Sequence, residues 1–272
     1  MAESYRSADE ASATPGDAVA KRRGVLWVAP DIVTSLGLLA GCVSLVSAIG
    51  GRFERAAAMI GLSILCDIAD GLVARASHTS SAFGLEYDSL SDVITFGVAP
   101  AILVDSWALR PLGAWALLIV AAYIICAALR LARFNVEAGT ATGKRRFVGL
   151  PVPGAAAAIG GILFGYRYFA LDVPRALCVV MIIVMLGLAA LMVSRVPYPT
   201  VKLEDPRSLL SPKLLAGAVV VAGLVFAAPR LTAFVVGLGY LLSGLILSAR
   251  GERVEGPGSA PAVKNTGGRQ ED

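Results

Sequence analysis

The chain has 272 residues, of which 56% are hydrophobic and 16% are charged, and its mean hydropathy is +0.72. Soluble domains carry about 25% charged residues, so this composition excludes an ordinary soluble domain. A net charge of +4 is too small to indicate a nucleic-acid partner. Four single cysteines and one histidine predict neither a disulfide framework nor a zinc site.

Apolar blocks predict about eight transmembrane helices, because about 20 mostly apolar residues cross a bilayer core of about 30 Å. The helices are expected at 31–50, 54–75, 84–108, 111–134, 150–170, 174–194, 212–228 and 231–249. The polar stretches 1–23 and 251–272 are expected to be disordered tails. We therefore predict an all-α fold, a polytopic membrane helix bundle with a six-helix core at 24–202 and two additional transmembrane helices at 203–250.

The positive charges predict the orientation in the membrane. Eight helices place both termini on one side, and 18 of the 24 Lys and Arg residues fall on that side. Cytoplasmic segments carry the excess of positive charge, so both tails are expected in the cytoplasm and the chain in the inner membrane. The halves of the chain show no internal repeat, which disfavours a transporter with alternating access.

Four aspartates lie where the second predicted helix ends and the third begins. Asp67 and Asp70 are three residues apart and Asp88 and Asp92 four apart, so each pair shares one face of its helix. The short connection 76–83 makes the two helices antiparallel neighbours, and the pairs can then face each other. Ionisable residues within membrane helices are costly and usually functional. The sequence therefore predicts a polar cavity at the cytoplasmic side of the bundle.

The residue types around this cavity predict a metal and a phosphate-containing substrate. Clustered carboxylates repel one another unless a cation neutralises them. An all-oxygen ligand set suits a divalent cation such as Mg²⁺ or Mn²⁺, as one ion or two. Gly71 leaves room for a ligand beside the cluster, and Arg75 offers a planar cation for phosphate.

Two other interpretations of the acids stay open. They can be hydrogen-bond partners between helices, with the glycines permitting close packing. They can also line an ion or proton pathway. The pathway is less favoured because all four acids lie near one face of the membrane and no comparable acid follows on the other side.

Eight fixed residues span the end of the second predicted helix and the start of the third: Asp67-x2-Asp70-Gly71-x2-Ala74-Arg75-x8-Gly84-x3-Asp88-x3-Asp92. This pattern matches at every fixed position the signature of the CDP-alcohol phosphatidyltransferases, and the chain therefore resembles that family. The resemblance implies an enzyme that transfers a phosphatidyl group from a CDP-linked lipid to an alcohol and releases CMP.

The resemblance also implies roles for these residues. Asp67, Asp70 and Asp88 would bind divalent metal, and Asp92 would be the general base while also lying near the metal. The residues expected to bind the CDP-lipid are Asp67, Asp70, Gly71, Ala74, Arg75, Gly84 and Thr34.

Four further segments of the chain resemble the bacterial family members that use serine. They are 91–100, 129–135, 149–155 and 193–202. They imply CDP-diacylglycerol and L-serine as substrates, phosphatidylserine and CMP as products, and a homodimer. A cation is expected against the serine carboxylate. In order of preference the candidates are Arg133 and Arg130, followed by Lys144, Arg145, Arg146 and Arg195.

Two alternatives to serine transfer remain. One is a related transferase with glycerol phosphate, inositol phosphate or choline as its acceptor. The other is an ion-coupled transporter.

Overall fold

The computed structural model describes residues 15–77, 82–140, 149–171, 173–194 and 228–249, and among these residues every regular element is helical. In chain order the elements are α2 (Pro15–Ile49), α3 (Phe53–Ser77), α4 (Ala82–Asp92), the π-helical η1 (Val93–Val98), α5 (Ala99–Val104), the π-helical η2 (Asp105–Leu109), the 3₁₀-helical η3 (Arg110–Trp115), α6 (Ala116–Thr140), α7 (Val152–Tyr168), α8 (Pro174–Val193) and α10 (Pro229–Ala249).

Four helical stretches within this part of the chain are long and apolar enough to cross a membrane: Asp31–Ile49, Phe53–Val73, Phe83–Val136 and Pro174–Val193. The third contains two predicted helices, and its chain direction changes at η3, where Gly113 has a φ of 56°. The predicted helical membrane protein is thus confirmed. The helix predicted at 212–228 lies outside the described residues except for Ala228, so the number eight stays a prediction.

One helix start and the regularity of one helix differ from those predicted. Helix α2 begins at Pro15, so residues 15–23 are helical rather than part of a disordered tail. Proline suits the first turn of a helix, and the Ala, Lys and Arg residues that follow are good helix formers. The predicted helix 84–108 is also not uniform, because two π-helical turns, η1 and η2, interrupt it.

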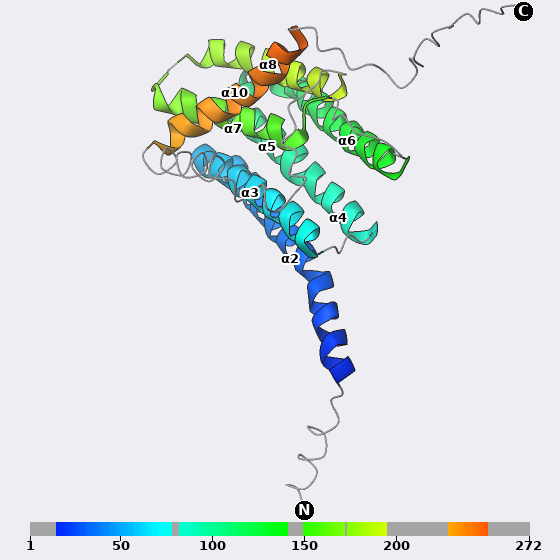
Figure 1. Ribbon diagram of the computed structural model, residues 1–272. Coiled ribbons are helices and arrows are strands. Elements are labelled where there is room, and N and C mark those ends of the chain that lie inside the picture. Colours follow the sequence, from blue (N-terminus) through cyan, green and yellow to red (C-terminus); the bar gives the residue numbers. More distant parts are fainter. Residues whose placement is uncertain (1–14, 78–81, 141–148, 172, 195–227, 250–272) are drawn as a thin grey trace, which may run out of the picture.

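Helices α2 and α3 lie side by side along much of their length (Figure 1). Helix α2 also packs against α4, η1 and α5. The contact is close at Gly41, where a Cβ atom would lie 2.7 Å from the Thr95 Oγ1 atom and 3.1 Å from its Cα atom. Glycine at this position therefore lets α2 approach the chain that follows α4.

Helix α10, orange in Figure 1, crosses α7 in close contact. A Cβ atom on Gly161 of α7 would lie 2.7 Å from the Ala233 carbonyl oxygen, and one on Gly237 of α10 would lie 2.6 Å from the Ala157 carbonyl oxygen. Small residues at a crossing let helix backbones approach closely in a membrane. This crossing therefore depends on glycines from both helices.

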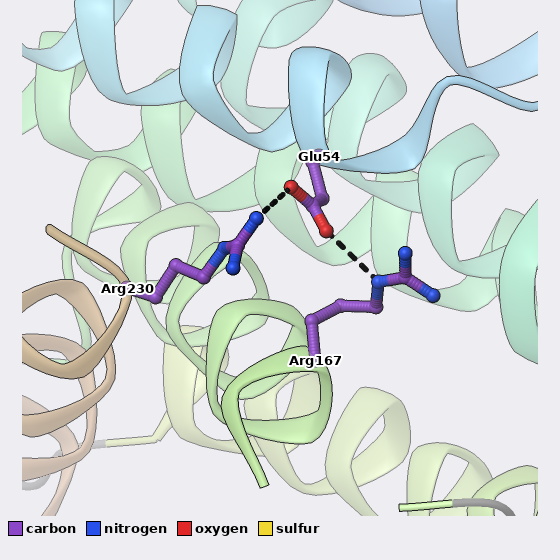
Figure 2. Close-up of polar contacts among 3 residues, drawn as sticks. All are labelled: Glu54, Arg167 and Arg230. Atoms are coloured by element: carbon purple, nitrogen blue, oxygen red, sulfur yellow. Dashed lines mark hydrogen bonds and ion pairs between the residues drawn. The ribbon is translucent and has the colours of Figure 1, made fainter. Parts of the chain in front are cut away.

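One carboxylate joins α3, α7 and α10 (Figure 2). Glu54 accepts a hydrogen bond from Arg167 Nε through Oε1 and another from Arg230 through Oε2, each at 2.9 Å. All three side chains are partly exposed. We call these three residues the Glu54 cluster.

Candidate active site

The structure brings three of the four predicted aspartates together. Asp67 comes from α3, and Asp88 and Asp92 come from α4. One carboxylate oxygen from each lies within 4.8 Å of the others, and all three side chains are half-buried. Helical spacing places Asp88 and Asp92 on one face of α4, and that face is turned toward Asp67. We call these three residues the aspartate triad.

Asp70 lies beside the triad but has a different set of contacts. Its side chain is 8% exposed, and its Oδ2 atom accepts a 2.7 Å hydrogen bond from Thr34 Oγ1. Its Oδ1 atom is buried without a hydrogen-bond partner. The resemblance groups Asp67, Asp70 and Asp88 as ligands, whereas the geometry groups Asp67, Asp88 and Asp92. Asp70 keeps one oxygen without a protein donor.

A pocket contains all three residues of the triad. Helix α2 contributes Thr34 and Gly37, α3 contributes Ser63, and the chain after Asp88 contributes Ser91, Thr95 and Phe96. Of these residues, only Thr34 was predicted from the sequence to belong to the site. The others lie about one helical turn from an aspartate or from Thr34, and this spacing is the signal that could have found them.

Ser63 fixes the α3 wall of the pocket against α2. Its Oγ atom donates to the carbonyl oxygens of Gly37 at 2.9 Å and Met59 at 3.0 Å. A Cβ atom on Gly37 would lie 3.3 Å from the Cys66 Cβ atom, so the two helices are already in tight contact there. This contact sets the position of Asp67, which lies one turn after Ser63.

The π-helical η1 follows Asp92 directly. Pro100 has no N–H to donate to the carbonyl of Phe96, four residues earlier. The buried Tyr123 hydroxyl on α6 donates to that carbonyl at 3.3 Å. Turns of π-helix occur frequently at functional sites. Here the turn carries Thr95 and Phe96 into the wall of the pocket.

The end of α4 is also attached to α6. Ser89 Oγ and the Asn135 side-chain amide are joined by hydrogen bonds of 2.9 and 3.2 Å. Ser89 follows Asp88 in the chain, so this contact holds the helix that carries two of the triad residues. Asn135 belongs to the 129–135 segment that resembles serine-using enzymes.

The structure distinguishes the two arginines of α6. Arg130 is half-buried, its charge is within electrostatic reach of Asp92, and its guanidinium carbon lies 5.6 Å from the centre of the Phe134 ring. Arg133 is exposed. Arg130 is thus the more buried of the two, and which of them binds the serine carboxylate stays a prediction. The remaining candidates lie outside the described residues: Lys144, Arg145, Arg146 and Arg195.

The other residues expected to contact the CDP-lipid lie at the ends of the same helices. Gly71 and Gly84 are partly buried, on α3 and α4 respectively. Ala74 and Arg75 belong to the last turns of α3, and their side chains are outside the described part of the molecule.

The donor set fits a divalent cation. The triad supplies three carboxylates, and the orphaned Oδ1 atom of Asp70 is a buried oxygen that a cation would satisfy. Hard cations such as Mg²⁺ prefer ligands of this kind. Such a site can bring a phosphate-containing substrate close to a carboxylate that accepts protons.

Comparison with known proteins agrees with the family resemblance of the aspartate motif. Residues 27–196 match the model of a family described as CDP-alcohol phosphatidyltransferase. The chain is 34% identical over 223 residues to the CDP-diacylglycerol–serine O-phosphatidyltransferase of Helicobacter pylori. The aligned residues are 81% of this chain and 91% of that protein. It is 31% identical over 182 residues to the enzyme of the same name from Bacillus subtilis, covering 67% of this chain and 96% of that protein.

A third relative comes from an archaeon. The archaetidylserine synthase of Methanothermobacter thermautotrophicus is 36% identical over 176 residues, which are 63% of this chain and 70% of that protein.

Proposed function

The chain belongs to the CDP-alcohol phosphatidyltransferase family, and we propose that it transfers the phosphatidyl group of CDP-diacylglycerol to L-serine. The names of all three relatives contain serine, and this is the observation that favours serine over other acceptors. The products are phosphatidylserine and CMP. The aspartate triad supports the chemistry of the reaction, and the relatives support the identity of the acceptor.

In the proposed reaction, Asp92 is the general base. Its carboxylate accepts the proton of the serine hydroxyl, whose oxygen forms a new bond to the phosphorus of the phosphatidyl group. The bond between that phosphorus and the CMP oxygen breaks, and CMP leaves. A proton acceptor within hydrogen-bond reach of the hydroxyl is what such an attack needs.

Asp67 and Asp88, with the open oxygen of Asp70, would hold Mg²⁺ or Mn²⁺, and Asp92 lies close enough to share it. The bound cation supplies neutralisation of the charge that develops on the cleaved pyrophosphate. Thr34 holds Asp70 in place through its 2.7 Å hydrogen bond. Gly71, Ala74, Arg75 and Gly84 are the proposed contacts of the CDP group.

The serine carboxylate is proposed to bind Arg130. A guanidinium group binds a carboxylate through two parallel hydrogen bonds, which fixes the orientation of the acceptor. Arg130 is favoured because it is half-buried and within electrostatic reach of the proposed base. Arg133, one turn away, is the second candidate.

The membrane arrangement is proposed from charge and hydropathy. Eight transmembrane helices, both tails and the active site facing the cytoplasm, and residence in the inner membrane are consistent with the distribution of Lys and Arg. We divide the chain into a catalytic core at 24–202 and two additional helices at 203–250, between the terminal segments 1–23 and 251–272. The family resemblance supports a homodimer, which crosslinking in native membranes would test.

The decisive experiment measures CMP release from CDP-diacylglycerol by the purified protein with each candidate alcohol in turn. Serine should support release and phosphatidylserine should accumulate. Release with glycerol phosphate, inositol phosphate or choline, and not with serine, would assign a different acceptor. An ion-coupled transporter would release no CMP with any alcohol.

A further inference from the structure

Thr95 carries a buried hydroxyl that has no hydrogen-bond partner among the described residues. Its side chain is 2% exposed and belongs to the π-helical η1. A helical threonine often donates to the carbonyl oxygen four residues earlier, as Thr232 does to Ala228 at 2.9 Å. Leaving such a buried hydroxyl unpaired is costly, so it requires an explanation. A bound ligand can supply the missing partner.

Thr95 lies in the wall of the pocket that contains the aspartate triad. It follows Asp92 by three residues, about one helical turn. A Cβ atom on Gly41 of α2 would lie 2.7 Å from the Thr95 Oγ1 atom. Gly41 comes one turn after Gly37, which also lines the pocket, so the hydroxyl lies against the face of α2 that borders this pocket. Glycine at position 41 leaves space for the hydroxyl and offers it no side-chain partner.

We propose that Thr95 binds the ammonium group of an amino-acid acceptor, with an ammonium N–H donating to Oγ1. This inference rests on the proposed function, which gives the serine hydroxyl to Asp92 and its carboxylate to Arg130 and leaves the ammonium without a partner. A threonine oxygen has lone pairs that accept such a bond. Because the hydroxyl is neutral, it binds the ammonium without adding negative charge beside the triad.

The same contact makes Thr95 a specificity-determining residue. An acceptor that carries an amino group satisfies the buried hydroxyl, whereas an acceptor without one leaves it unpaired. Sites built in this way discriminate strongly against substrates that lack the hydrogen-bonding group. Thr95 therefore favours serine over glycerol phosphate or inositol phosphate, neither of which has an ammonium group.

Thr95→Val keeps the shape of the side chain and removes the hydroxyl. The KM for serine should rise about 10-fold or more, as expected for loss of a hydrogen bond to a charged group, and the KM for CDP-diacylglycerol should stay within about 2-fold. The unfolding temperature should not fall, because the hydroxyl has no protein partner to lose. Thr95→Ser, which keeps a hydroxyl, should restore the KM for serine to within about 3-fold of its original value. Thr232→Val is the matched control and should leave both KM values unchanged, since its hydroxyl pairs within α10.

An analogue of serine shows whether the lost contact is to the ammonium. The compound 3-hydroxypropionate is serine without its amino group, and its inhibition constant against serine can be measured without turnover of the analogue. This constant should be the same within about 2-fold in Thr95→Val and the unaltered protein. An inhibition constant raised as much as the KM for serine would overturn the inference, as would an unchanged KM for serine in Thr95→Val. Failure of the proposed function is distinguishable, because the unaltered protein would then release no CMP with serine.

Discussion

Carboxylates occur in two opposite settings in this molecule. In the Glu54 cluster, each oxygen of one carboxylate accepts a hydrogen bond from a different arginine, and three helices are joined at a partly exposed position (Figure 2). In the aspartate triad, three half-buried carboxylates face one another within 4.8 Å. Asp70 next to the triad has a buried oxygen with no donor at all.

The Glu54 carboxylate has a structural role, whereas the carboxylates of the aspartate triad are arranged for chemistry. A carboxylate whose oxygens are satisfied by the protein's own arginines needs nothing further and can only stabilise the fold. Carboxylates that face one another repel and require an external cation, and that cation can bring a phosphate with it. Four predictions test this contrast, from the largest expected effect to the smallest.

Removal of divalent metal should abolish activity. Excess chelator should eliminate CMP release from CDP-diacylglycerol and serine, and added Mg²⁺ or Mn²⁺ should restore it. Because the cation binds the folded protein, adding Mg²⁺ to the chelated protein should also raise its unfolding temperature by a few degrees. That rise should vanish in Asp67→Asn and persist in Glu54→Gln. Full activity after thorough chelation would refute the assignment of metal to the triad.

Asp92→Asn should lower kcat by about 10²- to 10⁴-fold, because an amide of nearly the same shape is a poor proton acceptor. The variant should still bind CDP-diacylglycerol, whereas Asp67→Asn and Asp70→Asn should weaken both binding and turnover. Lipid affinity and serine-dependent CMP release would be measured on the same preparations. Asp105→Asn, in η2 of the same helical run, is the control. Near-normal turnover of Asp92→Asn would make Asp88 the next candidate for the base.

Arg130→Ala should raise the KM for serine by about 10-fold or more and leave the KM for CDP-diacylglycerol within about 2-fold, as expected for loss of a charge-assisted hydrogen bond. Arg133→Ala should have the smaller effect because its side chain is exposed. Steady-state kinetics with each substrate varied in turn would measure both variants. A larger rise in the KM for serine in Arg133→Ala than in Arg130→Ala would make Arg133 the preferred candidate for binding the serine carboxylate.

Glu54→Gln should leave kcat and both KM values within about 2-fold. Partly exposed ion pairs contribute about 1 kcal/mol or less each, so the unfolding temperature in detergent should fall by only a few degrees. The loss should grow smaller at high salt, which screens the repulsion between Arg167 and Arg230. A large loss of turnover with intact folding would show that the Glu54 cluster is not merely structural.

The positions of the membrane helices could be predicted from sequence because the signal is local: about 20 apolar residues identify each one. The π-helical turns could not, since apolar composition does not distinguish them from α-helix. Pro100 is the local mark of the first one, because it leaves the Phe96 carbonyl without its usual donor. The helical start at Pro15 does not follow from composition, because the polar residues of 1–23 favour disorder and helix alike.

The candidate site was predictable to the extent that its residues follow helical spacing. The aspartates share helix faces, and the structure brings three of them together as that spacing requires. The pairing of Asp70 with Thr34 joins residues 36 positions apart, and the contact of Tyr240 with Gly154 also joins distant parts of the chain. Such contacts depend on how helices pack, which the spacing within a single helix does not determine.

The glycine-lined crossing of α7 and α10 has a consequence for how the enzyme is made. Ribosomes deliver the chain from its N-terminus, so α7 enters the bilayer well before α10 is synthesised. Until then its Gly154 and Gly161 face has no α10 against it. The close packing of α7 therefore forms only when the last described helix has been inserted.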